Sequence, residues 1–261
     1  MNQLQVISLL GRKFPKRLAY DFDFPGYQTG RYDKKMEVRK VFLCLDFTEA
    51  CMDACKKFRP DLILTHHPFF FGKKKEIYVE DPMKKALDIR INNELDCPIF
   101  SYHTNFDVAK DGMNDTILSI LGWKCTAVAY DGLMRIAVLD EPMKTEDIAS
   151  LLIHAFSFDY LGYLSTGKII RKIGLIAGGG ANDFMTAIHE DVDLYISGDC
   201  SHHSRLDMRR YGLDYIELPH ECEELGFLSG MKNVIRDIDS NIEVECFAYE
   251  KYFSLRTKED E

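Results

Sequence analysis

The sequence has no long apolar run, no C-x-x-C pair and no signal-peptide pattern at its N-terminus. A membrane-spanning helix needs about 20 predominantly apolar residues, and no stretch approaches that length, so we expect no membrane segment. The N-terminal residues lack a basic start, an apolar centre and a small-residue cleavage site. The eight cysteines are scattered, mostly inside apolar runs, as is typical of buried, reduced thiols. These absences predict a cytoplasmic protein.

The sequence also lacks a basic stripe and an internal repeat. Lysine and arginine number 33 against 42 aspartates and glutamates, which gives a formal net charge of -9. The densest basic cluster, residues 73–75, is too short to follow a phosphate backbone, so we do not expect nucleic acid to be the main ligand. With 261 residues, 46% of them hydrophobic, the chain is long enough for one large domain or two medium ones.

Short apolar β-rich runs alternate with helical patterns, in two successive series. The first series predicts strands at 41–45, 62–64 and 98–100, and helices at 48–58, 82–94 and 113–121. The second predicts strands at 135–139, 172–177, 194–196, 215–218 and 244–248, and helices at 145–156, 181–189, 201–210 and 221–231. This alternation favours an α/β fold with mixed sheets. We place a hinge at 127–133, and therefore one lobe at 1–126 and a second at 127–261.

The first chemical feature is the pair His66 and His67, which directly follows the strand at 62–64. Ligands of open α/β sheets gather at the carboxyl ends of strands. Adjacent residues on extended backbone point in opposite directions, so the two imidazoles suit a two-metal centre. The alternative is a solvated loop with two histidines.

Two more segments place histidine and carboxylate after a strand. His103 and Asp107 follow the strand at 98–100. Asp107 is suited to bridging two divalent ions, and His103 to orienting it, acting on a water or binding the metal itself. His220 and Glu224 are four residues apart and would share one helical face. The alternative explanation of Asp107 is that it caps a turn. The alternative for Glu221 and Glu223 is an acidic first helical turn that complements the helix dipole. Oxygen and imidazole donors without cysteine suit Zn, Mn, Fe or Mg.

Two weaker features also follow strands. Gly178, Gly179 and Gly180 precede a helix whose N-terminus could receive a phosphate or carboxylate, although a tight turn is the simpler explanation of the three glycines. His202 and His203, after Gly198 and Asp199, are candidates for lining the site, or else lie on a capped surface helix.

In this order along most of the chain, these segments resemble the Nif-three-like family of dinuclear metal proteins, often labelled GTP cyclohydrolase type 2 homologues. The matching stretches are 61–68, 103–107 with 112–115, 178–180, 197–199 with 202–203, and 220–224. The chain departs from the family pattern at Pro219, where glycine is usual, and at Glu221, where an aromatic residue is common.

The resemblance implies two α/β lobes with mixed sheets flanked by helices, and a metal site in the cleft between them. It implies two divalent ions (Zn, Fe or Mn) with five ligands: His66, His67, Asp107, His220 and Glu224. It gives His103 a part in proton transfer. The substrate-binding candidates are Gly178, Gly179, Gly180, His202 and His203. A homo-oligomer, a hexameric ring, also follows from the resemblance.

The function expected on this basis is a dinuclear metal-dependent hydrolase that uses a metal-activated water. The substrate would be a small molecule, and the family label points to a guanine nucleotide. Phosphoester or amide hydrolysis would suit the same centre. The alternative is a non-catalytic metal-binding adaptor or regulatory protein that acts through protein partners.

Overall fold

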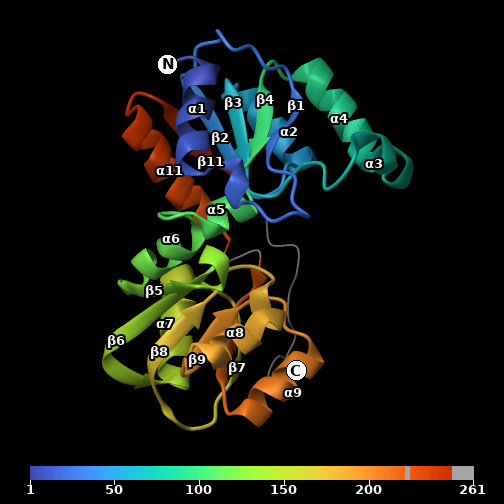
Figure 1. Cartoon of the computed structure of the whole chain (residues 1–261). Helices are drawn as coiled ribbons and strands as arrows, with labels where there is room; N and C mark the ends of the chain where they lie inside the picture. The colour runs from blue at the N-terminus through green and yellow to red at the C-terminus, as the bar shows by residue number, and fades with distance from the viewer. Residues whose placement is uncertain (221–223, 249–261) are drawn as a thin grey trace. The chain divides into compact units, whose positions relative to one another are not determined.

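The computed structural model describes residues 1–220 and 224–248, which fold into two α/β units (Figure 1). The first unit contains residues 1–116 and 226–247, and the second contains 117–220, 224–225 and 248. Each has one mixed sheet with helices against it, so the predicted fold class is confirmed. Among the described residues, none of the helices has the length and apolar character needed to cross a membrane.

The sheet of the first unit has the strand order β1-β4-β3-β2-β11. Its strands are β1 (Gly26–Gly30), β2 (Lys40–Cys44), β3 (Leu62–Thr65), β4 (Pro98–Ser101) and β11 (Glu243–Cys246). β11, β2, β3 and β4 run parallel, and β1 pairs antiparallel with β4. Because β2, β3 and β4 are parallel, their carboxyl ends lie at one edge of the sheet.

Helices cover both faces of this sheet, which explains why its central strands are mostly apolar and buried at nearly every position. The helices are α1 (Gln3–Lys13), α2 (Glu49–Phe58), α3 (Lys74–Glu80), α4 (Pro82–Glu94), α5 (Thr104–Val108) and α11 (Gly226–Ile238), with the short turn η1 (Lys16–Leu18). One core cluster joins alternate residues of the strands to α2 and α4, including Phe42, Ile63, Met52 and Ile91. Helices α1 and α11 lie on the other side of the sheet (Figure 1).

The sheet of the second unit has the order β5-β6-β8-β9-β10-β7. Its strands are β5 (Cys125–Ala129), β6 (Met134–Lys144), β7 (Gly162–Leu164), β8 (Ile169–Leu175), β9 (Leu194–Ser197) and β10 (Asp214–Glu217). The helical segments are α6 (Met113–Ile120), which begins in the first unit, η2 (Tyr130–Gly132), α7 (Thr145–Phe156), η3 (Gly180–Asp183), α8 (Phe184–His189) and α9 (His202–Tyr211). Strands β8, β9 and β10 are parallel, so their carboxyl ends also share one edge.

The chain returns to the first unit near its end, which differs from the predicted lobe at 127–261. Helix α11 and strand β11 belong to the first unit because β11 pairs with β2, with Val244 opposite Val41. Within α11, Phe227, Met231 and Ile235 are fully buried. A linear division at the hinge misses this pairing because nothing local in residues 226–247 indicates which sheet they join.

Candidate metal site

Polar side chains follow β2, β3 and β4, three of the four parallel strands of the first sheet, at their carboxyl ends. Asp46 comes after β2, His66 and His67 come directly after β3, and His103 comes after β4. The backbone continues the pairing past the strands: His66 and His67 donate their amides to the carbonyls of Cys44 and Leu45. The strand order therefore brings together residues that are far apart in sequence.

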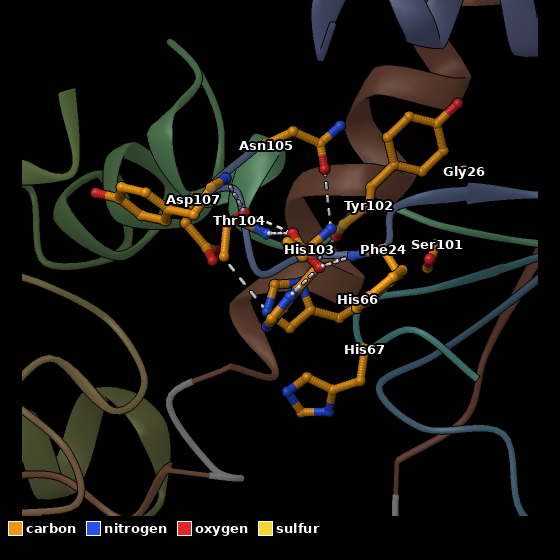
Figure 2. Close-up of polar contacts among 12 residues, drawn as sticks. Phe24, Gly26, His66, His67, Ser101, Tyr102, His103, Thr104, Asn105 and Asp107 are labelled. Atoms are coloured by element: carbon orange, nitrogen blue, oxygen red, sulfur yellow. Dashed lines mark hydrogen bonds and ion pairs between the residues drawn. The ribbon is translucent and has the colours of Figure 1, made fainter. Parts of the chain in front are cut away.

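The three imidazoles converge. The candidate ligand atoms of His66, His67 and His103 all lie within 4.8 Å of one another, and Figure 2 shows these residues as sticks. The ring centroid of His66 lies 4.9 Å from that of His67 and 5.1 Å from that of His103. His66 is completely buried, with Phe227 of α11 beside it at 5.3 Å.

An oxygen acceptor faces Nδ1 of each ring. The distances are 2.9 Å from His66 to the Tyr102 carbonyl, 2.9 Å from His67 to Asp46 and 2.9 Å from His103 to Asp23. Carbonyl and carboxylate oxygens only accept, so Nδ1 carries the proton in each neutral ring and the lone pair lies on Nε2. This arrangement is the usual support of a histidine that binds a metal.

Asp23 is the most elaborately held of these supports. Its side chain is buried and accepts hydrogen bonds from His103, from the amide of Phe24 at 2.7 Å, and from both the amide and the hydroxyl of Thr104. Burial alone would raise the pKa of Asp23, but the hydrogen bonds from His103, Thr104 and the Phe24 amide outweigh it and lower that pKa. Asp23 is therefore a carboxylate at neutral pH.

Asp107 lies on α5, in the same unit as the three histidines. Its Oδ1 is 3.7 Å from Nε2 of His66 (Figure 2), and its carbonyl accepts from Asn114 at 3.1 Å. The turn after α5 needs Gly112, since a Cβ there would lie 1.8 Å from the Phe106 carbonyl oxygen. The donor set of three imidazoles and a nearby carboxylate suits Zn, Fe or Mn, so these residues fit a divalent ion of the implied kind.

The second unit repeats the pattern at the carboxyl edge of its own sheet. Gly178 follows β8, Asp199 follows β9 and His220 follows β10. His220 Nδ1 lies 2.6 Å from Asp199, and its Nε2 lies 3.0 Å from Glu224, which is buried. Burial alone would lower the pKa of His220, but Glu224 and Asp199 outweigh it and raise that pKa to about 10. Without a metal ion, this pair therefore holds a proton that a cation would replace.

Two backbone positions beside this pair have positive φ. Gly178 has φ +71°, and a Cβ there would lie 2.6 Å from Glu224 Oε1 and 3.5 Å from His220 Nε2. Asp199, which is not glycine, has φ +56°. The first glycine of the predicted loop thus makes room for the His220–Glu224 pair; phosphate binding by Gly178, Gly179 and Gly180 stays a prediction.

The structure does not bring every predicted residue to these clusters. His202 and His203 lie in the first turn of α9, are exposed and contact each other, with ring centroids 5.4 Å apart. Their role as substrate-binding residues stays a prediction. Glu221 and Glu223 lie outside the described residues.

Asp23 and Asp46 were not among the site residues predicted from the sequence, and Asp199 was given no role. Aspartate is common, and each of these three lies far from its histidine in sequence. The usable signal was position: Asp46 and Asp199 each follow a predicted strand, as the histidines do.

Comparison with known proteins gives one family over nearly the whole chain. The model of Duf34/NIF3 (NGG1p interacting factor 3) matches residues 1–252. A Clostridium perfringens protein named GTP cyclohydrolase 1 type 2 homolog is 29% identical over 252 residues, covering 93% of this chain and 95% of that protein. A Methanocaldococcus jannaschii protein of the same name is 25% identical, covering 95% and 99%.

Solved structures agree in fold. A hypothetical protein of Staphylococcus aureus superposes with a TM-score of 0.87 at 21% identity, covering 98% of this chain and 99% of that one. A Bacillus cereus protein described as related to NIF3 gives 0.86 at 20% identity, with the same coverage. At this identity the likeness establishes the fold of the chain.

Proposed function

This chain belongs to the Duf34/NIF3 family, and on that premise we propose that it is a metal-dependent hydrolase. One observation carries the proposal: three imidazoles converge within 4.8 Å, each with an oxygen acceptor at Nδ1. Apolar side chains would pack this end of the sheet better than three imidazoles, because burying polar groups costs free energy. Packing therefore does not explain the cluster. Relatives named GTP cyclohydrolase 1 type 2 homolog support a nucleotide as the substrate.

The proposed ligands keep the assignments of the sequence analysis. His66, His67 and Asp107 would hold divalent metal in the first unit, and His220 and Glu224 in the second. Bound divalent ions would lower the pKa of a water molecule and polarise the bond it attacks. Asp46 and Asp199 would orient His67 and His220 through Nδ1.

His103 is the proposed proton carrier. With Nδ1–H donated to Asp23, the ring accepts a proton at Nε2, and the Asp23 carboxylate stabilises the imidazolium that results. The alternative role for His103, which its place in the imidazole cluster allows, is that of a further metal ligand. The two roles differ in outcome: His103→Ala should keep the metal content and lose turnover if it carries protons, and lose metal if it is a ligand.

The first test is metal content per chain by elemental mass spectrometry, on untagged protein purified without chelator. About two equivalents of Zn, Fe or Mn would support the proposal. Turnover of nucleotides and phosphoesters is then measured with that metal. Asp107→Ala should lose turnover while its circular dichroism spectrum is retained, and His154→Ala, an exposed histidine on α7, should behave as the wild type.

The competing function is a metal-binding protein that acts through protein partners. The family's description, NGG1p interacting factor 3, names such an interaction for that family. Bound metal without turnover of any nucleotide or phosphoester would favour this alternative, and absence of bound metal even after soaking would contradict both functions.

A further inference from the structure

Two exposed phenylalanine rings lie beside the imidazole cluster of the first unit. Phe24 is 42% exposed and Phe71 is 50% exposed. Their ring centroids are 6.3 Å apart at an interplanar angle of 71°. The ring of Phe71 also meets His103 edge-on, at 5.4 Å and 81°. Its sequence neighbours Phe69 and Phe70 are buried, so Phe71 alone of this run is turned to solvent.

The backbone that presents these two rings is firmly held. Gln28, only 9% exposed, donates to the Phe24 carbonyl at 2.7 Å and accepts from the Phe70 amide at 3.1 Å. One buried side chain thus ties the loop of Phe24 to the loop of Phe71. Asp23 accepts from the Phe24 amide with the same oxygen, Oδ1, that lies 2.9 Å from His103 Nδ1. The orientation of the His103 imidazole and the position of Phe24 are therefore coupled through Asp23.

We propose that Phe24 and Phe71 form the binding surface for a planar heteroaromatic ring, such as a purine base, carried by the substrate. That the molecule carrying this ring is the substrate rests on the proposed hydrolase function. That a heteroaromatic ring binds at Phe24 and Phe71 does not depend on that function. Exposed aromatic faces stack on bases with little dependence on which base is present, and the ring so bound would lie next to His103.

Size and charge favour this occupant over a macromolecule. Two half-exposed phenylalanines offer about 200 Å², whereas a stable protein interface buries about 800 Å² on each partner. The net charge of -9 opposes a polynucleotide. A single base carried by a small molecule matches both the area and the charge.

Fluorescence gives a direct test that needs no turnover. Trp123 is the only tryptophan, so Trp123→Phe removes the background and Phe71→Trp places a reporter at the site. In the presence of EDTA, GTP, ATP and guanosine should quench this reporter, whereas ribose 5-phosphate should leave it unchanged. Equal quenching by ribose 5-phosphate, or none by any of the three base-containing probes, would overturn the proposal.

Leucine variants separate aromatic stacking from mere apolar contact. Phe71→Leu and Phe24→Leu should each weaken GTP binding about tenfold by calorimetry, while Phe71→Tyr should retain it. Phe22→Leu is the matched control, because Phe22 is on the same loop and 61% exposed but stacks on Tyr20. Unchanged GTP affinity in both leucine variants would contradict the proposal.

Two further outcomes keep this inference distinct from the proposed function. If Phe71→Leu lowers the molar mass in sedimentation, the surface is an interface between copies and the proposal fails. If the wild type lacks metal and turnover yet its GTP affinity depends on Phe71, the hydrolase function fails while the ring site stands.

Discussion

At the scale of single residues, three aspartates determine how the candidate metal ligands present their rings. Asp46 is the clearest case, since it is half exposed and its contact with His67 Nδ1 is 2.9 Å. Asp46→Ala should weaken Zn binding by about 10- to 100-fold, measured by competition with a chromogenic chelator. Asp53→Ala, an exposed aspartate on α2, should leave the affinity unchanged. Equal affinities in the two variants would show that Asp46 does not orient the ring.

Gly178 offers a second residue-scale test with a close control. Gly178→Ala places a methyl group against Glu224 and His220 at a position with φ +71°. Gly212 has nearly the same backbone, φ +68°, but nothing lies within 4 Å of a Cβ there. Both variants should lose about 1 kcal/mol of stability from the left-handed backbone. Only Gly178→Ala should also lose metal affinity, and an equal loss in Gly212→Ala would contradict the assigned role.

The histidine motifs could be predicted from sequence, but which aspartate pairs with which histidine could not. His66, His67, His103 and His220 each follow a recognisable apolar strand. Their hydrogen-bond partners are remote: Asp46 is 21 residues from His67, and Asp23 is 80 residues from His103. Only the order of strands in the sheet brings these pairs together, and that order depends on long-range pairing that no local pattern encodes.

At the scale of elements, one buried carboxylate joins α3 and α4 to β1. Asp88 of α4 is 1% exposed and accepts from Thr29, Tyr78 and Asn92, and from Lys74 at 2.6 Å. Asp88→Asn should lower the free energy of unfolding by about 2 kcal/mol, measured by urea denaturation. Glu80→Gln, an exposed residue of α3, is the control and should change it by less than about 0.5 kcal/mol.

The same network predicts how the loss depends on pH. Burial alone would raise the pKa of Asp88, but the hydrogen bonds of Lys74, Thr29 and Tyr78 outweigh it and lower that pKa below the ordinary 3.8. A carboxylate whose pKa is lower in the folded state stabilises the fold at pH values above its pKa in the unfolded chain. That contribution is lost as the pH falls through its pKa in the folded state. The difference between wild type and Asp88→Asn should therefore be full at pH 7 and shrink below about pH 4. A difference that grows in acid would contradict this account.

Two helices could be predicted closely from their sequence, whereas three of the four edge strands of the two sheets could not. The predicted helices at 82–94 and 145–156 match α4 and α7, and α4 begins with Pro82 behind an Asp81 cap. β1, β5 and β7 were not predicted. β1 begins and ends in glycine, and β5 has exposed or half-exposed side chains throughout, so neither shows the apolar run on which strand prediction depends. α1 was also missed, although Asn2 and Gln5 form a capping box.

At the scale of the whole molecule, each unit places its chemistry at the carboxyl ends of three parallel strands. In the first, β2, β3 and β4 are followed by Asp46, His66 with His67, and His103. In the second, β8, β9 and β10 are followed by Gly178, Asp199 and His220. This edge is where open α/β sheets bind ligands, so the same topological rule accounts for both clusters.

Because the proposed ligands occur in both units, bound metal should stabilise the whole chain. An ion at one hundred times its Kd contributes about 2.7 kcal/mol to the free energy of unfolding. For a chain of this size, that should raise Tm by about 5–10 °C, measured by calorimetry with Zn and then with EDTA. His66→Ala should lose most of the rise, whereas His154→Ala should keep it. A Tm that is the same with metal and with chelator would contradict the ligand assignment, since an ion bound only to the folded state must raise Tm.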